Sequence, residues 1–348
     1  MSKKIRLFLG GYVNFPNAQN INCDNIAKYI DKEKFEVHVM YTNKKEIDKS
    51  IYKSKNIKLH KLIHHRFIWY WSKYLIMLLG NYDIYYLPKM EQVDIDFAKR
   101  HKNKVFISSI EGVITDNTNN SIEFRNYHTK IMDDSFTISR CIAESVKKYW
   151  NIETTVLPLG IVEQPLKEQY NESVKKIIWV GNIKSNKRPK LLLQCAKAFP
   201  EISFYMIGDG DLLSEIKWVC KDENINNIFF TGRIPNEEVY KYMEECDLLL
   251  MTSEYEGLPK VIQEAAQCCI PSIYINENYE VDFIQSGVNG FAVHDIEAMI
   301  SCIRYLMNNP QLYRSMSEAV YESIQPYTWK NVIQEYELFF EKMYNKVR

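Results

Sequence analysis

Residues 248–265 read LLLMTSEYEGLPKVIQEA, and this stretch predicts a buried strand that leads directly into a helix. The run Leu248–Met251 is short and entirely apolar, which is typical of a strand covered on both faces of a parallel sheet. Gly257 permits an unusual backbone turn, and Pro259 suits the first position of a helix. The N–H groups at such a helix start can hold an anion such as a pyrophosphate.

The same alternation of short apolar strands and helices runs through the second half of the chain. The strands are predicted at 177–180, 202–207, 228–231, 248–251 and 273–275. The helices are predicted at 189–198, 212–222, 236–245 and 259–268. This alternation predicts a parallel sheet with right-handed crossovers, in which ligands bind beyond the carboxyl ends of the strands.

The first half begins in the same way. A strand at Ile5–Leu9 leads into Gly10–Gly11, where we expect a tight turn because glycine has the backbone freedom for one. Further elements are predicted as a helix at 21–30 and strands at 35–41, 82–86, 105–108, 135–138 and 154–157. After Pro310 the pattern is helical, and the apolar face of the last helix is predicted to consist of Trp329, Val332, Ile333, Tyr336, Leu338, Phe339 and Met343.

The chain has 348 residues, which exceeds what one hydrophobic core usually supports, so two domains are expected. Residues 161–174 are polar, include Pro165 and lack apolar periodicity, which indicates a linker. We therefore predict an α/β protein with domains at 1–165 and 166–325 and a closing helix at about 326–348.

The composition excludes several classes of protein. Lys plus Arg and Asp plus Glu are both 44, so the molecule as a whole has no charge that would attract nucleic acid. The eight cysteines contain no C-x-x-C pair, which favours reduced thiols in a reducing cytoplasm. The apolar runs are too short for a signal peptide or a membrane-spanning helix. We expect a cytoplasmic protein.

Three charged residues are the best candidates for ligand contacts. Glu256 precedes the predicted helix start and Glu264 lies in its second turn, where side chains lean back toward the N-terminus. Both carboxylates could accept hydrogen bonds from sugar or ribose hydroxyls. Lys187 follows the strand 177–180, where a cation could neutralise a leaving diphosphate. The alternative interpretation is structural: one glutamate favours the helix dipole, and the other two side chains are solvated surface charges.

Two short motifs carry little weight. Gly208-Asp209-Gly210 follows a strand as in a dinucleotide fingerprint, but Leu213 stands where the third glycine is required. The D-x-D pairs at 94–96 and 209–211 match a metal-binding pattern without identifiable supporting ligands. We expect neither an NAD site nor a metal site.

Taken in order, the motifs of the second half resemble those of the family 4 glycosyltransferases, or glycosyl transferases group 1. The matching elements are Val180-Gly181 with Lys187, Ile207-Gly208-Asp209-Gly210, Phe230-Thr231-Gly232, Asp247, and Glu256 with Glu264, followed by Ala265 and Pro271. The resemblance implies the GT-B fold of two Rossmann-like domains facing across a cleft. The first domain, completed by the closing helix, would bind the acceptor, and the second would bind the nucleotide-sugar donor. Transfer would retain the anomeric configuration and need no metal or cofactor.

The resemblance also implies residue roles. Lys187 would contact the donor diphosphate, Glu264 the ribose, and Glu256 the donor sugar. The other implied donor contacts are Gly181 and Asn182, Gly257, Leu258 and Pro259, the nucleobase segment Gly232, Arg233 and Ile234, and Gly11 in the glycine loop of the first domain.

The chain departs from the family pattern at three positions. Asn182 stands where the family often has arginine, so the diphosphate clamp would be weaker or would be completed by Lys184 or Arg188. Cys269 occupies a usual glycine position. Glu111 stands where a histidine often precedes a glycine, and we place it on the possible acceptor side.

A basic and aromatic segment lies between Lys44 and Leu79. Its nine basic residues are Lys44, Lys45, Lys49, Lys53, Lys55, Lys58, Lys61, Arg66 and Lys73, against Glu46 and Asp48. With the adjacent run Phe67–Trp71, this composition is typical of a helix in an anionic membrane interface. The alternative, which we favour for Trp69 and Leu75–Leu79, is that the apolar side chains cover the sheet and the lysines solvate the outside.

The expected function is transfer of a sugar from a UDP-sugar or GDP-sugar to a glycan or polyprenyl-linked acceptor. The setting would be the synthesis of a bacterial capsule, lipopolysaccharide or exopolysaccharide, with the enzyme attached peripherally to the inner face of the plasma membrane. Two alternatives stay open: a sugar-nucleotide epimerase of the same fold, and an inactive nucleotide-sugar-binding protein.

Overall fold

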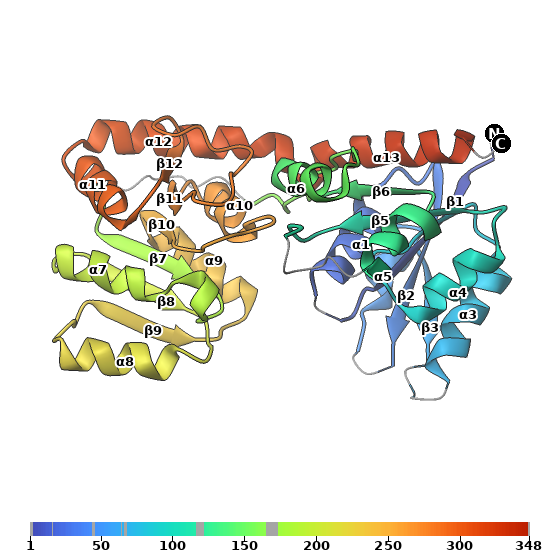
Figure 1. Cartoon of the computed structure of the whole chain (residues 1–348), viewed down its shortest axis with the longest axis horizontal. Helices are drawn as coiled ribbons and strands as arrows, with labels where there is room; N and C mark the ends of the chain where they lie inside the picture. The colour runs from blue at the N-terminus through green and yellow to red at the C-terminus, as the bar shows by residue number, and fades with distance from the viewer. Residues whose placement is uncertain are drawn as a thin grey trace. The chain divides into compact units, whose positions relative to one another are not determined.

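The computed structural model describes residues 3–15, 17–43, 46–63, 65, 68–115, 122–164 and 173–346. The chain divides into two compact units: unit 1 is Met1–Gly160 with Tyr327–Arg348, and unit 2 is Ile161–Pro326. Each unit has its own parallel sheet and its own helices (Figure 1). Much of the predicted linker, residues 165–172, lies outside the described residues.

Unit 1 is built on six parallel strands in the order β3-β2-β1-β4-β5-β6. The strands are β1 (Ile5–Tyr12), β2 (Phe35–Thr42), β3 (Lys58–Leu62), β4 (Ile84–Tyr86), β5 (Val105–Ile110) and β6 (Asp134–Thr137). The helices are α1 (Ala18–Tyr29), α2 (Lys49–Ser54), α3 (Trp69–Gly80), α4 (Gln92–Arg100), α5 (Ile122–Asn126), the π-helical turn η1 (Tyr127–Ile131), α6 (Arg140–Trp150) and α13 (Trp329–Lys346).

Unit 2 has six parallel strands in the order β12-β11-β10-β7-β8-β9. The strands are β7 (Lys176–Val180), β8 (Ser203–Ile207), β9 (Ile228–Gly232), β10 (Leu248–Met251), β11 (Ser272–Ile275) and β12 (Gly290–Val293). The helices are the 3₁₀ turn η2 (Ser185–Lys187), α7 (Lys190–Ala198), α8 (Leu213–Asp222), α9 (Asn236–Glu245), α10 (Lys260–Gln267), α11 (Ile296–Met307) and α12 (Pro310–Ile324), and the 3₁₀ turn η3 (Gln325–Tyr327) joins the units.

The two strand orders place the ligand-binding edges of the units. In unit 1 the chain runs outward from β1 and then returns to place β4 on the other side of β1. In unit 2 it returns in the same way to place β10 beside β7. Ligands of such sheets bind beyond the carboxyl ends of the strands at this switch point. The loops after β1 and β4, and those after β7 and β10, therefore occupy the functional positions.

Strand β10 shows why the apolar runs of the sequence form central strands. All four of its residues are buried, and it lies between β7 and β11. Both of its faces are covered, so each leucine removed from water contributes about 1.5–3 kcal/mol to folding. The predicted α/β class with two parallel sheets is confirmed.

Helix α13 packs on unit 1 and shares that unit's core. Trp329 is almost completely buried and lies against Gly160, where a Cβ atom would come within 2.4 Å of the indole ring. The hydroxyl of Tyr336 donates to the carbonyl of Leu157 at 3.2 Å. The predicted apolar face is correct except at Leu338, which is 64% exposed, while Phe340 is buried in its place.

The glycine pair of the first strand differs from its prediction. Gly10 and Gly11 lie inside β1, which continues to Tyr12, so no tight turn occurs there. The glycines are needed for close packing instead. A Cβ atom on Gly11 would meet the Cys23 side chain of α1 at 2.7 Å, and one on Gly10 would meet the carbonyl of Tyr86 at 3.0 Å.

Three strand predictions also needed correction. The edge strands β3 and β12 were not predicted: β3 mixes polar residues with leucine, and β12 is a four-residue strand that begins with glycine. The strand expected at 154–157 forms only an isolated bridge between Val156 and Thr137.

Helix α3 agrees only in part with the orientation we favoured. Trp69, Ile76 and Met77 pack in the core of unit 1, as expected, but Leu75, Leu78 and Leu79 do not. Its lysine, Lys73, is completely buried, whereas its apolar residues Trp71, Leu75, Leu78 and Leu79 are 59%, 48%, 44% and 80% exposed. The ion pairs of Lys73 with Glu91 and Asp94 explain how the lysine can face the protein interior. Lys44, Lys45, Arg66 and Phe67 of the predicted basic segment lie outside the described residues. No helix in the described part of the chain is long and apolar enough to cross a bilayer.

Candidate functional site

Backbone hydrogen bonds join the loops after β7, β8 and β9 in unit 2. The N–H of Gly181 donates to the carbonyl of Ile207 at 3.0 Å, and that of Gly208 donates to the carbonyl of Gly232 at 3.0 Å. The N–H of Ile183 donates to the carbonyl of Asp209 at 3.0 Å. These bonds hold the three loops together at the carboxyl edge of the sheet.

Two glycines make this approach possible. Gly208 has a φ of +139°, and a Cβ atom there would lie 1.9 Å from the carbonyl oxygen of Gly181. Gly210 has a φ of +159°, and its Cβ would lie 2.5 Å from the carbonyl oxygen of Ile183. The G-x-G pattern that resembled a dinucleotide fingerprint therefore serves contact between neighbouring loops.

The segment after β10 carries Glu256 and leads into α10. The helix begins at Lys260, one residue later than predicted, and Pro259 is the residue that precedes it. Among the described residues no side chain caps this helix start. Gly257, Leu258 and Pro259 lie between Glu256 and the helix, so a ligand bound by backbone N–H groups here would lie close to Glu256.

Lys187 and Glu256 meet although they are 69 positions apart in the sequence. The amine of Lys187 donates a hydrogen bond to Oε1 of Glu256, and the two side chains are 21% and 13% exposed. The carbonyl of Lys187 accepts a bond from the hydroxyl of Thr252 at 2.7 Å, and Trp179 in turn donates to that hydroxyl at 3.0 Å. The structure thus brings together the two residues to which the sequence assigned the chemistry.

Arg188 ties three loops together from the adjacent position. Its guanidinium donates to the carbonyl of Thr252 at 2.7 Å and of Ser253 at 3.1 Å, and to both carboxylate oxygens of Glu277 at 2.9 and 3.0 Å. Its backbone has a φ of +45°, a conformation that costs a non-glycine residue about 1–2 kcal/mol. The side chain holds the loop that carries Glu256, which is a positioning role.

Glu264 belongs to a different set of contacts. It faces Asn236 at the start of α9, which donates a side-chain hydrogen bond to it. Burial raises the pKa of Glu264, although Asn236 and Lys260 oppose this effect. Glu264 therefore lies beside the β9–α9 connection, which contains the predicted nucleobase segment Gly232, Arg233 and Ile234.

The other predicted donor residues differ in exposure. Gly232 has a φ of +71° and open space on its Cβ side, while Arg233 and Asn182 are exposed and Ile234 is half-buried. Lys184, the other candidate to complete the diphosphate clamp, is exposed. All of them lie on loops at the carboxyl ends of β7 and β9.

On unit 1, Glu111 follows β5 and lies at the carboxyl edge of that sheet. It accepts hydrogen bonds from the side chains of Asn22 at 3.2 Å and Ser109 at 2.9 Å. Gly11 lies near the carboxyl end of β1, which is separated from β5 by β4. Glu111, predicted for the acceptor side, and Gly11, predicted as a donor contact, therefore both lie toward the carboxyl edge of the sheet of unit 1.

Sequence reasoning missed several supporting residues of unit 2. Thr252, Asn236 and Glu277 hold predicted site residues through the bonds described above. Tyr279 is buried near Glu256, and burial, aided by the charge of Glu256, raises the pKa of its phenol. None of these has a sequence signal of its own, because each is recognisable only by the loop against which it packs.

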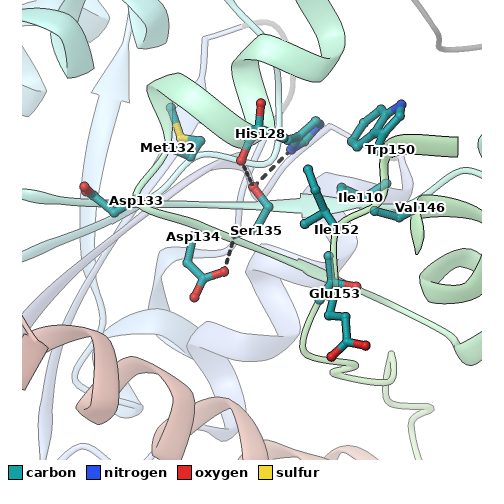
Figure 2. Close-up of a pocket in the computed structure, with 12 residues that line it drawn as sticks. Ile110, His128, Met132, Asp133, Asp134, Ser135, Val146, Trp150, Ile152 and Glu153 are labelled. Atoms are coloured by element: carbon teal, nitrogen blue, oxygen red, sulfur yellow. Dashed lines mark hydrogen bonds between the residues drawn. The ribbon is translucent and has the colours of Figure 1, made fainter. Parts of the chain in front are cut away.

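A separate cavity of about 180 Å³ lies in unit 1 beside β6 (Figure 2). His128, Ser135 and Trp150 line it together with the carboxylate side chains of Asp134 and Glu153. Burial lowers the pKa of His128 to about 3, and its Nδ1 is 2.7 Å from the hydroxyl of Ser108, so the ring is a neutral part of the interior. The cavity contains no residue that the sequence predicted for the site.

The described residues contain no cluster of three or more histidine, cysteine, aspartate or glutamate side chains arranged to hold a metal ion. Of the two D-x-D motifs, Asp94 is engaged with Lys73, and Asp209 accepts a hydrogen bond from the N–H of Gly210 at 2.8 Å.

Residues 162–323, which make up nearly all of unit 2, match the family described as Glycosyl transferases group 1. Unit 2 is a domain of this family. An uncharacterized glycosyltransferase of Methanocaldococcus jannaschii is 24% identical over 251 residues, which cover 70% of each chain. The O-antigen biosynthesis glycosyltransferase WbnH of Escherichia coli is 31% identical over 122 residues, which cover 35% of this chain and only 34% of WbnH.

The fold of this glycosyltransferase is also that of solved GT-B structures. HepE of Anabaena, solved with UDP and glucose, superposes with a TM-score of 0.77 at 14% identity, over 98% of this chain and 100% of HepE. The predicted family and fold are both confirmed.

The loop contacts predict that Gly208→Ala destabilises unit 2 by about 3 kcal/mol or more, because a backbone carbonyl occupies the space of the new methyl group. Gly287→Ala is the matched control: its φ is +83°, but nothing lies within 4 Å of its Cβ position. We expect the control to cost about 1–2 kcal/mol. Urea unfolding midpoints measure both, and equal losses would contradict the argument.

Arg188→Ala is expected to lower the stability of unit 2 by about 1–2 kcal/mol, mainly through the two bonds to backbone carbonyls. Its bond to Glu277 is partly exposed and should contribute less. Arg314→Ala removes an exposed ion pair with Glu318 and should change stability by less than about 0.5 kcal/mol. Thermal unfolding would argue against the positioning role if both variants melted at the wild-type temperature.

Proposed function

We propose that this glycosyltransferase moves a sugar from a UDP-sugar or GDP-sugar to a glycan or polyprenyl-linked acceptor, with retention of configuration and without a metal ion. The observation that carries the proposal is the Lys187–Glu256 pair beside the start of α10, at the switch point of unit 2. The cation and the helix start suit the phosphates of a sugar diphosphate, and the carboxylate suits the hydroxyls of its sugar.

Each part has a distinct task in this proposal. Departure of the nucleoside diphosphate leaves negative charge on the phosphate oxygens and positive character on the sugar ring. Lys187, released from Glu256, and backbone N–H groups near the start of α10 would stabilise the phosphate charge. Glu256 would accept hydrogen bonds from the sugar hydroxyls and so orient the ring. In the absence of donor, Lys187 and Glu256 neutralise each other's charge and share a hydrogen bond.

Glu264 would hold the nucleoside end of the donor. Its contact with Asn236 places it beside the Gly232–Ile234 segment, where the ribose and base would lie. A carboxylate accepts hydrogen bonds from two vicinal hydroxyls more effectively than a neutral group does. This arrangement gives the nucleoside and the sugar separate contacts on either side of the diphosphate.

Support for the biological setting comes from the relatives. WbnH is named for O-antigen biosynthesis, and HepE was solved with UDP and glucose. We infer a role in assembling a bacterial surface polysaccharide at the cytoplasmic face of the membrane. An epimerase would convert donor without acceptor, and an inactive binding protein would bind nucleotide without releasing it from a sugar donor.

Lys187→Ala and Glu256→Ala are each expected to lower kcat/KM by about 100-fold or more, because both groups act where charge develops during transfer. Lys190→Ala is the control, since Lys190 forms an exposed ion pair with Glu215 in the same unit. Release of UDP or GDP from a panel of nucleotide-sugars, incubated with lipid extract, measures the rate. Near-normal turnover in both site variants would refute the proposed site.

The exposed side of α3 supports peripheral membrane attachment. We name the α3 surface as Ile68, Trp71, Leu75, Leu78 and Leu79, all of which are exposed. Their spacing of three or four positions forms one apolar stripe, and α3 has no acidic residue. The lysines Lys49, Lys53, Lys55, Lys58 and Lys61 of the neighbouring elements are also exposed. An apolar helix face in a basic unit suits the interface of an anionic membrane.

Leu75→Asp combined with Leu79→Asp should abolish flotation with phosphatidylglycerol vesicles at low salt, because the stripe then carries charges that the membrane repels. Leu338→Asp is the matched control: Leu338 is 64% exposed on α13 and lies outside the α3 surface. The control should float like the wild type. Absence of wild-type binding, or equal loss in the control, would reject the attachment.

A further inference from the structure

Unit 1 has a second set of charged residues at its own switch point. Tyr12 is the last residue of β1, and Lys89 and Glu91 lie on the loop that follows the adjacent strand β4. This loop is fixed from two sides. The hydroxyl of Tyr127 donates to the carbonyls of Leu87 and Lys89 at 2.7 and 3.0 Å, and Gln19 donates to the carbonyl of Pro88 at 2.9 Å.

A buried ion cluster lies beneath this loop. The amine of Lys73 is 2.5 Å from Oε2 of Glu91 and 2.6 Å from Oδ1 of Asp94, and neither Lys73 nor Asp94 is exposed. Burial would raise the pKa of Glu91, but the charge of Lys73 and the hydrogen bonds it receives lower it. The hydroxyl of Tyr12 also donates to Glu91, at 2.7 Å. Glu91 is therefore ionised and already bound by Lys73 and Tyr12.

Lys89 is not neutralised by this cluster. Its amine lies 3.8 Å from the centre of the Tyr12 ring, on the ring face, and it forms no ion pair with any described residue. Burial lowers the pKa of this amine despite the nearby charge of Glu91. An aromatic ring accepts no ordinary hydrogen bond from the ammonium, so Lys89 keeps N–H donors for a ligand. A bound anion would also replace the hydration that the partly buried ammonium has lost.

We propose that Lys89, held against the face of Tyr12, binds a phosphate group of the acceptor. The inference rests on the proposed function, because it takes unit 1 as the acceptor unit. Because unit 2 already supplies Lys187 and the start of α10 for the donor diphosphate, we assign the second fixed cation, at the switch point of unit 1, to an anion of the acceptor. The acceptor class is then a phosphate-linked lipid carrier rather than a neutral glycan.

The role of the buried cluster follows from its charges. Lys73 draws Glu91 inward, and Glu91 orients the phenol of Tyr12 through the bond to its hydroxyl. The ring then presents its face to Lys89. Tyr12, Glu91 and Lys73 are thus positioning residues for Lys89, and Lys89 is the group that contacts the phosphate.

Calorimetric binding of geranyl phosphate, geraniol, UDP and GDP to the full chain tests the proposal. We expect Lys89→Met to weaken geranyl phosphate binding by about tenfold or more, through loss of a charge-assisted hydrogen bond. Binding of the nucleotides should not change. Lys102→Met, at an exposed lysine of the same unit, should behave like the wild type for every ligand. Lys89→Arg keeps the charge, so it should restore binding to within about threefold.

Four results would overturn the proposal. The first is that Lys89→Met binds geranyl phosphate as tightly as the wild type does, and the second is that the wild type binds geraniol as tightly as geranyl phosphate. The third is that Lys89→Met loses nucleotide binding to the same extent as geranyl phosphate binding. The fourth is that inorganic phosphate competes as effectively as geranyl phosphate. The last result would assign the site to free phosphate. Failure of the proposed function itself would be distinguishable, because the wild type would then release neither UDP nor GDP from nucleotide-sugars incubated with lipid extract.

Discussion

The close contact between the loops after β7 and β8 is the constraint on which unit 2 depends. Gly208 approaches the carbonyl of Gly181 so closely that no side chain fits, and the loop after β9 is bonded to Gly208 in turn. Arg188 then extends this framework to the loop after β10. Lys187 and Glu256 can meet because the loops that carry them have little freedom to separate.

Each unit contains a lysine paired with carboxylate groups, but the two sets differ in burial. In unit 2, Lys187 and Glu256 pair with one another while both remain partly exposed, so a ligand can exchange with either partner. In unit 1, Lys73 is completely buried with two carboxylates and cannot be exchanged, since removing one partner would leave a buried charge. The first arrangement suits binding and the second suits positioning.

The sequence predicted most of the fold, because short apolar runs such as Leu248–Met251 can only be central strands when helices alternate with them. It missed β3 and β12, which lie at sheet edges where the apolar signal is weak. The glycines at 10 and 11 were assigned to a turn, whereas they permit helix α1 to approach strand β1. The burial of Lys73 on α3 could not be predicted, since it depends on the carboxylates of Glu91 and Asp94, which lie on another element.

The candidate site was predictable to the extent that its residues belong to ordered motifs. Lys187 and Glu256 were identified in this way, and the structure brings them into contact. Arg188 was identified as a cation, but its role in holding the loop after β10 was not predicted. That role depends on carbonyls that are 64 and 65 positions away in the sequence. A crystal structure with bound UDP or GDP tests the central claim most directly. We predict that Lys187 leaves Glu256 and contacts the diphosphate while Glu264 binds the ribose; a nucleotide bound elsewhere, or phosphates that reach the protein only through a metal ion, would contradict it.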